Sequence, residues 1–172
     1  MPICSMPWGD SVGRPPAYNK EQLLEKVTDC LWTQGYAATP ISLLVERSGV
    51  KAASLYAAFG SKKGIMLASL DAYARRARDE WRRVLAQHAP GRQQMDAFLH
   101  ALLDASLEDP ASRGCFLVNA ILEAHPGEPE FAEVLSRYME ELRNILMEEL
   151  QKAPDLRPGQ SAEAAALFAI PP

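Results

Sequence analysis

Apolar residues recur along this chain at spacings of three and four, in stretches long enough for two or more helical turns. This period is that of an amphipathic α-helix. Alternating β-branched segments, which would indicate strands, are absent from the sequence. The pattern therefore predicts an all-α fold. The helices should be separated by breaks rich in glycine and proline, at Pro15-Pro16, Gly35, Ser48-Gly49, Gly60-Ser61, Pro90-Gly91, Asp109-Pro110, Pro126-Gly127 and 154–159.

Three short helices are predicted first. The first begins after Asn19, a favourable N-cap, and ends at Gly35. The second opens at Thr39-Pro40, with the threonine as cap and the proline at the first helical position. A tight turn at Gly49-Val50 then leads into a third helix at Lys51–Ala58. Two short helices joined by a glycine-containing turn, after a supporting helix, predict a helix-turn-helix.

A long helix follows directly from this unit. It is capped by Ser61 and continues to about His88, a length of roughly 40 Å at 1.5 Å per residue. The remaining amphipathic segments are Arg92–Leu107, Gly114–Ala124, Pro129–Lys152 and Ser161–Ile170.

The net charge of −4 hides an asymmetry along the chain. Through Arg83 there are 12 Lys and Arg residues against 8 Asp and Glu, and from Val84 onward there are 6 against 14. Attraction to phosphate acts within a Debye length of about 8 Å, so an acidic second half that faces away does not prevent DNA binding. The sequence contains no secretory signal and no membrane-spanning run, which predicts a cytoplasmic protein without membrane contact.

The residues around the turn resemble the DNA-binding domain of the TetR family. The matching positions are Gly35-Tyr36, Thr39, Ile41, Gly49-Val50, Ser54-Leu55-Tyr56, Phe59 and Ser61-Lys62, and SLYAAFGSK at residues 54–62 is the most specific part. The resemblance implies a flexible arm at 1–17, a DNA-binding domain at 18–65 and a helical effector and dimerisation domain at 66–172. It also implies operator DNA and a small-molecule effector as partners, and a homodimer.

Candidate DNA contacts follow from groove geometry and from the resemblance. The major groove is about 12 Å wide, and the predicted recognition helix offers it a slim surface of Lys51, Ala52, Ala53 and Ser54. The resemblance implies phosphate contacts by Tyr56 and Lys62 and a DNA-contacting arm that contains Arg14. Thr39, at the start of the second helix, is expected to add backbone N–H donors. The alternatives are a buried aromatic at Tyr56 and an ordinary surface charge at Lys62. Few side chains are available to read bases, which predicts modest intrinsic specificity.

The second part of the chain offers candidate effector-binding residues, although for any one of them core packing is the simpler account. They are Trp81, Phe98, Leu102, Phe116, Asn119, Glu123 and Tyr138. Asn119 and Glu123 are polar residues four apart in an apolar segment, and they form either the polar floor of a pocket or a solvent-facing edge. Cys115 is a candidate redox sensor if Arg113 favours its thiolate, and otherwise a small buried residue.

Catalytic motifs, metal-ligand clusters and cofactor-binding loops are absent from the sequence, which predicts a protein that is not an enzyme and uses no cofactor and no metal. The resulting hypothesis is a ligand-responsive repressor of TetR type. The last predicted helix stops at Ile170, so the chain is expected to lack a terminal helix and to dimerise weakly. The alternative is therefore a truncated helical interaction protein with weak or no operator binding.

Overall fold

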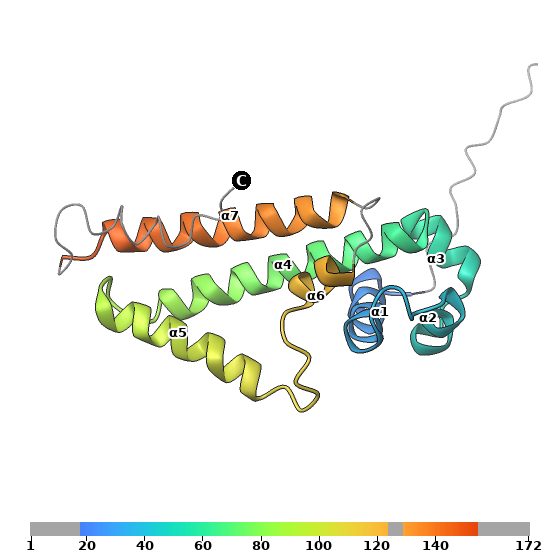
Figure 1. The fold of residues 1–172 in the computed structure, drawn as a ribbon, viewed down its shortest axis with the longest axis horizontal. Coiled ribbons are helices and arrows are strands. Elements are labelled where there is room, and N and C mark those ends of the chain that lie inside the picture. The colour runs from blue at the N-terminus through green and yellow to red at the C-terminus, as the bar shows by residue number, and fades with distance from the viewer. Residues whose placement is uncertain (1–17, 124–128, 155–172) are drawn as a thin grey trace, which may run out of the picture.

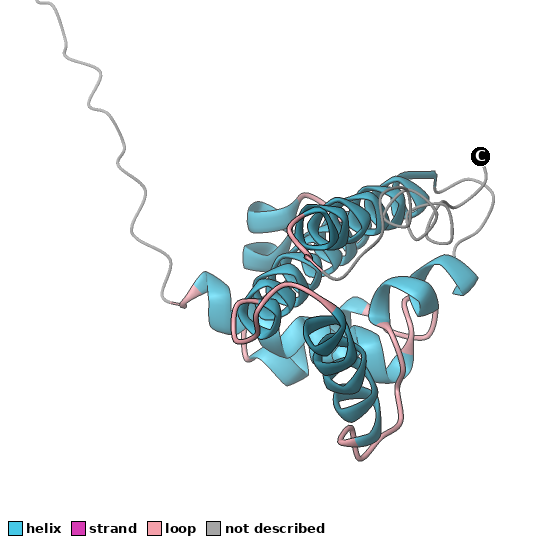
Figure 2. Cartoon of the chain, turned by 90° about the vertical axis from the view of Figure 1, so that its left-hand side faces the viewer, coloured by secondary structure: helices cyan, strands magenta, loops and turns pink. Residues whose placement is uncertain are grey.

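The computed structural model describes residues 18–123 and 129–154, and Figures 1 and 2 show that these residues form helices without any strand. The all-α prediction is confirmed. The arm with Arg14 and the segment predicted as the helix Ser161–Ile170 lie outside the described residues. The helices are α1 (Lys20–Gln34), α2 (Ile41–Ser48), α3 (Ala52–Phe59), α4 (Lys62–Leu85), α5 (Arg92–Leu107), α6 (Phe116–Glu123) and α7 (Pro129–Gln151).

Helices α1, α2 and α3 pack together at one end of the molecule (Figure 1), where their apolar faces contribute to the core that is shared by all the described helices. Asn19 caps α1 as predicted, its side-chain oxygen accepting the Gln22 N–H at 3.0 Å. The core residues Val27, Leu44 and Leu55, one from each helix, have no exposed surface. Burying a side chain of this kind stabilises the fold by about 1.5–3 kcal/mol, so this contact fixes the relative orientation of the three helices.

The start of α2 differs from the prediction. Pro40, rather than Thr39, is the capping residue, and no side chain caps the helix. Thr39 is fully buried, and its hydroxyl donates a hydrogen bond of 2.6 Å to the Gly35 carbonyl. Because the loop folds inward at Thr39, this hydroxyl bonds the carbonyl at the end of α1 and does not cap α2.

The joint between α3 and α4 is tight. Ser61 caps α4 as predicted, its hydroxyl accepting the Gly64 N–H at 3.0 Å. A Cβ atom at Gly64 would lie only 1.9 Å from the Phe59 carbonyl oxygen. Only glycine fits at this position, and the close approach of the two backbones sets the angle at which α3 leaves α4.

Helix α4 runs the length of the molecule, and α7 lies alongside it (Figure 1). It ends at Leu85 rather than at His88, because Gln87 and His88 donate to carbonyls only three residues back and so tighten the final turn. Helix α4 therefore links the three-helix unit at one end of the molecule to α5 at the other. A long helix that follows directly from this unit was predicted from the sequence.

Helices α5 and α6 complete the described part. The bounds of α5 agree with the prediction, whereas α6 begins at Phe116 instead of Gly114. Gly114 has a left-handed backbone conformation (φ 68°), which excludes it from the helix. None of the described helices is both long enough and apolar enough to cross a membrane.

Candidate DNA-binding surface

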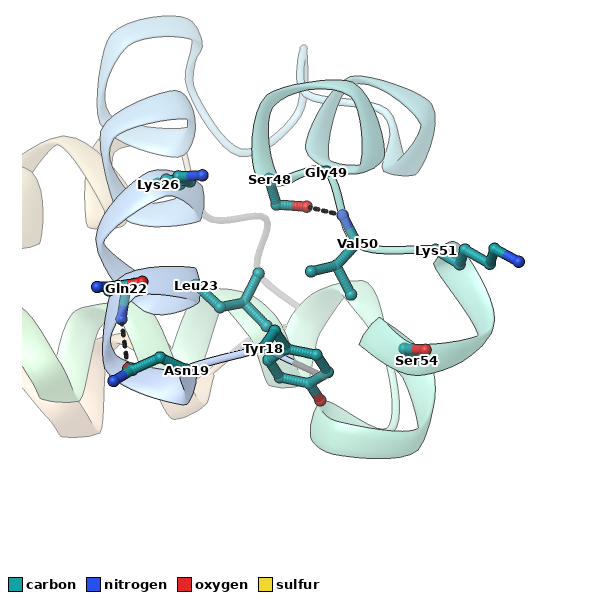
Figure 3. A pocket seen from close by; sticks show the side chains of 10 residues that line it. All are labelled: Tyr18, Asn19, Gln22, Leu23, Lys26, Ser48, Gly49, Val50, Lys51 and Ser54. Atoms are coloured by element: carbon teal, nitrogen blue, oxygen red, sulfur yellow. Dashed lines mark hydrogen bonds between the residues drawn. The ribbon is translucent and has the colours of Figure 1, made fainter. Parts of the chain in front are cut away.

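The turn between α2 and α3 is held by a small set of local contacts. Gly49 adopts the left-handed conformation (φ 73°), and the Ser48 hydroxyl accepts the Val50 N–H at 3.1 Å. The Val50 side chain points toward Leu23 of α1 (Figure 3). Together with the buried Leu55, these contacts fix α3 on the surface of the unit, as expected for the second helix of a helix-turn-helix.

The outer face of α3 is narrow and exposed. Ala53 and Ala57 are exposed, Ala52 and Ser54 are partly buried, and the Lys51 side chain extends away from the body of the protein (Figure 3). Small side chains on this face would let α3 approach the floor of a groove about 12 Å wide. The sequence-predicted residues Lys51, Ala52, Ala53 and Ser54 are therefore brought together, with Ser54 turned toward α1.

Tyr56 projects from the same helix and is 42% exposed. The alternative of a buried core aromatic is therefore excluded. An exposed tyrosine at the edge of a recognition helix presents a hydroxyl that can donate to a phosphate oxygen.

Beside α3, a groove of about 490 Å³ separates it from the start of α1. The walls of the groove, drawn in Figure 3, include Tyr18, Lys26, Lys51 and Ser54. Two lysines and two hydroxyl groups at one concave surface give it the charge and the hydrogen-bond donors that a phosphate backbone would contact.

Lys62, the first residue of α4, contacts the loop that leads into α2. Its ammonium group is 3.5 Å from the Ala37 carbonyl oxygen and 4.7 Å from the centre of the Tyr36 ring. The first N–H groups of α2, at Ile41 and Ser42, have no partner within the helix and no capping side chain. The loop contacted by the Lys62 cation therefore leads directly into a helix N-terminus with free N–H donors, and both are groups that suit a phosphate.

Thr39 does not supply these donors itself. Its hydroxyl is bound to Gly35, and its N–H donates to the Tyr36 carbonyl at 3.4 Å. Thr39 therefore holds the loop that presents the start of α2. The free N–H donors are those of Ile41 and Ser42 after Pro40. Ile41 was named from the sequence as a motif position, and neither residue was predicted as a DNA contact.

Two carboxylates of α1 form ion pairs with basic residues from outside the three-helix unit. Glu25 lies 2.8 Å from Arg76 of α4, and Asp29 lies 2.6 Å from Arg113. These pairs neutralise two of the acidic charges of α1. The candidate DNA-binding surface is consequently more positive than the composition of α1 suggests.

Three further contacts tie the three-helix unit to the second part of the chain. The Glu123 carboxylate accepts the Tyr36 N–H at 2.6 Å, and Lys63 lies 2.6 Å from Glu130. The hydrogen bond from Lys63 holds the pKa of Glu130 below its usual range. The Arg113 guanidinium, which also binds Asp109, stacks over the Trp32 ring at 4.2 Å. Sequence reasoning missed the roles of Trp32 and Lys63, since each partner is distant in sequence.

The second part contains a cavity of about 520 Å³. Of the candidate effector residues, Trp81, Phe98, Leu102 and Tyr138 line it, and so does Cys115.

The remaining three candidates lie elsewhere. Phe116 is buried against the Trp32 and Tyr73 rings, and Glu123 binds the loop before α2. The side chain of Asn119 donates to the Arg113 carbonyl at 2.7 Å, which holds the loop before α6. Neither polar residue is a pocket floor or a simple solvent-facing edge.

Cys115 stands at the cavity wall, and the Tyr73 hydroxyl donates to its sulfur at 3.9 Å. Burial, followed by the neighbouring Cys115, raises the pKa of Tyr73. The Arg113 guanidinium, which the sequence analysis named as the group that could favour the Cys115 thiolate, pairs instead with Asp109 and Asp29.

Within residues 18–123 and 129–154, no group of three or more His, Cys, Asp or Glu side chains could hold a metal ion.

Known proteins resemble this chain in both sequence and structure. A family model described as bacterial regulatory proteins, tetR family, matches residues 23–69. The HTH-type transcriptional repressor ComR of Escherichia coli (strain K12) is 29% identical over 137 residues, or 78% of this chain and 65% of ComR. The chain thus spans less than two thirds of the length of ComR. An uncharacterized HTH-type transcriptional regulator of Bacillus subtilis (strain 168), YezE, is 20% identical over 84% of this chain and 74% of its own length.

Solved structures give the same picture. A cysteine mutant of the TetR family transcriptional regulator CifR, complexed with 26-bp double-strand operator DNA, superposes with a TM-score of 0.75 and 26% identity. The match covers 90% of this chain and 83% of that one. The reduced form of E. coli NemR shares the fold, with a TM-score of 0.73 and 18% identity over 86% of this chain and 81% of NemR. Residues 23–69 thus match the family model of the tetR bacterial regulatory proteins, and the described fold is similar to that of solved TetR family regulators.

Proposed function

We propose that this protein binds operator DNA through α3 and represses transcription, and that a small molecule bound among α1, α4, α5 and α7 controls its affinity for DNA. One observation carries the proposal. The slim, exposed face of α3 borders the groove with Lys26 and Lys51, and the same unit carries Lys62 against the loop that leads into the uncapped start of α2.

In this arrangement α3 enters the major groove, where Ala53 and Ala57 allow close approach and can contact thymine methyl groups. Tyr56, Lys62 and the N–H groups of Ile41 and Ser42 bind phosphates and set the position of α3 along the duplex. Since phosphate contacts outnumber base contacts, affinity arises mainly from the backbone and specificity is modest. The relatives support this assignment, because ComR is described as a repressor and CifR has been solved on operator DNA.

A second copy of the chain completes the proposed complex. Dimeric helix-turn-helix proteins place two recognition helices in successive major grooves, about 34–36 Å apart. A homodimer on a two-fold symmetric operator meets this requirement. Helices α4 and α7 run away from α3 toward the second part, where the two copies can meet without crowding the DNA.

Effector control follows from the position of the cavity. Its wall includes Trp32 of α1 as well as Tyr73 of α4, so an occupant touches helices that carry the DNA-binding unit. A ligand that binds one arrangement of these helices more tightly shifts the population toward it. The distance between the two recognition helices changes as a result, and with it the affinity for DNA.

In vitro selection from random duplex DNA tests the proposal, because it needs no knowledge of the natural operator. Sequences enriched by the full chain should contain an inverted repeat. Their affinity should fall by about a hundredfold or more between about 50 and 200 mM salt, because bound phosphates release counterions. If no sequence is enriched and the binding of DNA does not change with salt concentration, the proposal is contradicted and the helical interaction protein is favoured.

A further inference from the structure

The walls of the cavity are formed largely by aromatic rings that support one another. Trp81 lies 4.8 Å from Tyr138 and 6.4 Å from Phe98, centre to centre, and Trp32 lies 5.2 Å from Tyr73. These five rings come from α1, α4, α5 and α7. Because each ring packs against another, the wall is formed in advance, and its volume of about 520 Å³ suits a small organic molecule.

The charged groups of the wall are already engaged. Arg76 lies 2.8 Å from Glu25, Glu80 accepts a hydrogen bond of 2.8 Å from Arg83, and Asp109 lies 3.1 Å from Arg113. Asp109 also accepts the Arg113 N–H at 2.8 Å. A charged ligand would find no free counter-ion on this wall without breaking one of these pairs.

The polar groups that remain are neutral. The Ser106 hydroxyl donates to the Leu102 carbonyl at 3.0 Å. Among the described residues, the Trp32 indole N–H is buried and has no hydrogen-bond partner. Moving a charge out of water into such surroundings is strongly unfavourable, whereas an uncharged ring loses little and gains contact with the aromatic wall.

We propose that the effector is an uncharged aromatic molecule, which packs against the cavity wall formed by Trp81, Phe98 and Tyr138 and reaches Trp32 of α1. This inference rests on the proposed function, since it specifies the ligand class of the effector cavity. An anion would face the carboxylates of Glu80 and Asp109, and a cation would face Arg76. Contact with Trp32 places the ligand directly against the helix that supports α2 and α3.

The neutral fluorophore N-phenyl-naphthylamine is a suitable probe, because its emission rises in apolar surroundings. The full chain without DNA should bind it. Three competitors with one ring system then test the charge preference: naphthalenemethanol is neutral, naphthoate is an anion and naphthylmethylammonium is a cation. The neutral compound should displace the probe at concentrations about tenfold lower than either ion. Equal or stronger displacement by an ion would overturn the inference.

The location is tested by filling the cavity. Ala101→Phe places a ring inside it, and Ala97→Phe places the same ring one turn earlier on α5, outside the cavity wall. Ala101→Phe should reduce probe affinity about tenfold or more, whereas Ala97→Phe should leave it unchanged. If Ala101→Phe fails to fold by circular dichroism, Ala105→Phe at the exposed edge of the same cavity replaces it. Probe binding unaffected by either filling variant would contradict the assignment.

The exposed leucines of α5 (Leu99, Leu103 and Leu107) form another apolar surface that could attract the probe. Leu103→Gln changes the middle of that surface, and we expect it to leave probe binding unaltered. The DNA selection described above is carried out on the same preparations. If the chain enriches DNA but does not bind the neutral ligand, only this inference is overturned. If it binds the ligand but enriches no DNA, the proposed function as a regulator is contradicted, and the assignment of the ligand cavity remains supported.

Discussion

Gly64 is the residue with the least room for change, because a Cβ atom there would meet the Phe59 carbonyl oxygen at 1.9 Å. Gly64→Ala should therefore move α3 away from the start of α4. We expect a loss of about 1–3 kcal/mol in the free energy of unfolding and at least about a tenfold weaker affinity for selected DNA. Thermal melting and fluorescence anisotropy measure the two effects. Unchanged stability and affinity would contradict the described α3–α4 joint.

The two described cysteines differ in their surroundings. Cys30 is buried in the three-helix unit, and desolvation raises the pKa of its thiol, whereas Cys115 is half-buried at the cavity wall. Iodoacetamide should therefore label Cys115 before Cys30, because the thiolate is the reactive form and must be accessible. Peptide mapping by mass spectrometry measures the order, with Cys115→Ser as the control. Faster labelling of Cys30 would contradict the described burial.

The roles of some single residues could be predicted from the sequence, and the roles of others could not. The exposure of Tyr56 and the slim face of α3 follow from the motif. The role of Glu123 does not, because its partner, the Tyr36 N–H, is 87 residues away. The same holds for Thr39, whose hydroxyl turns inward to Gly35 only because the loop folds under α2. Local patterns identify faces and caps, and partners distant in the chain require the packed structure.

Among the elements, helix bounds were predicted well where a capping residue or a break marks them. Asn19, Ser61 and the Pro90-Gly91 break place the starts of α1, α4 and α5. The end of α4 and the start of α6 were each misplaced by a few residues, since the tightened turn after Leu85 and the left-handed Gly114 leave no distinct periodic signal.

The side chain of Arg113 joins the loop before α6, which borders the cavity, to α1. Arg113 binds Asp109 in its own loop and Asp29 of α1, and it stacks over Trp32. Arg113→Met keeps the apolar stem and removes these charged contacts, so we expect a lower melting temperature and a weaker response of DNA affinity to the cavity ligand. Arg143→Met, which removes a surface pair with Glu140, should change neither. An equal effect of both variants would contradict the connecting role.

The same variant gives a specific pH dependence. The hydrogen bonds from Arg113 hold the pKa of Asp109 below its usual range. A carboxyl group with a lowered folded-state pKa stabilises the fold fully above its unfolded pKa, and this contribution disappears as the pH falls through the lowered value. The difference in melting temperature between wild type and Arg113→Met should therefore narrow as the pH falls through and below the usual range of aspartate. A difference in melting temperature that stays constant with pH would contradict the lowered pKa of Asp109.

At the scale of the whole molecule, the charge asymmetry of the sequence gains a spatial meaning. The candidate DNA-binding surface carries Lys26, Lys51 and Lys62, while Glu25 and Asp29 of α1 pair with residues outside the three-helix unit. A protein with a net charge of −4 can thus present a positive face to DNA.

Operator binding should involve two chains. The account predicts two copies per selected duplex, with the centres of the half-sites about 34–36 Å apart. Native mass spectrometry of the complex measures the number of chains, and hydroxyl-radical footprinting measures the spacing of the protected sites. One chain per duplex with a single protected site would show that the chain binds without a partner and would contradict the dimeric mechanism.

The central claim, that α3 and the residues beside it bind DNA, is tested most directly by the affinity of phosphate-contact variants for one selected duplex. Lys62→Gln should weaken binding at least about tenfold and reduce the slope of log affinity against log salt by about 2, because each of the two bound chains loses one phosphate contact. Tyr56→Phe should weaken binding by a smaller factor, and Lys152→Gln, at the far end of α7, should have no effect. If Lys62→Gln and Lys152→Gln bind the duplex equally at every salt concentration, the proposed DNA-binding surface is wrong.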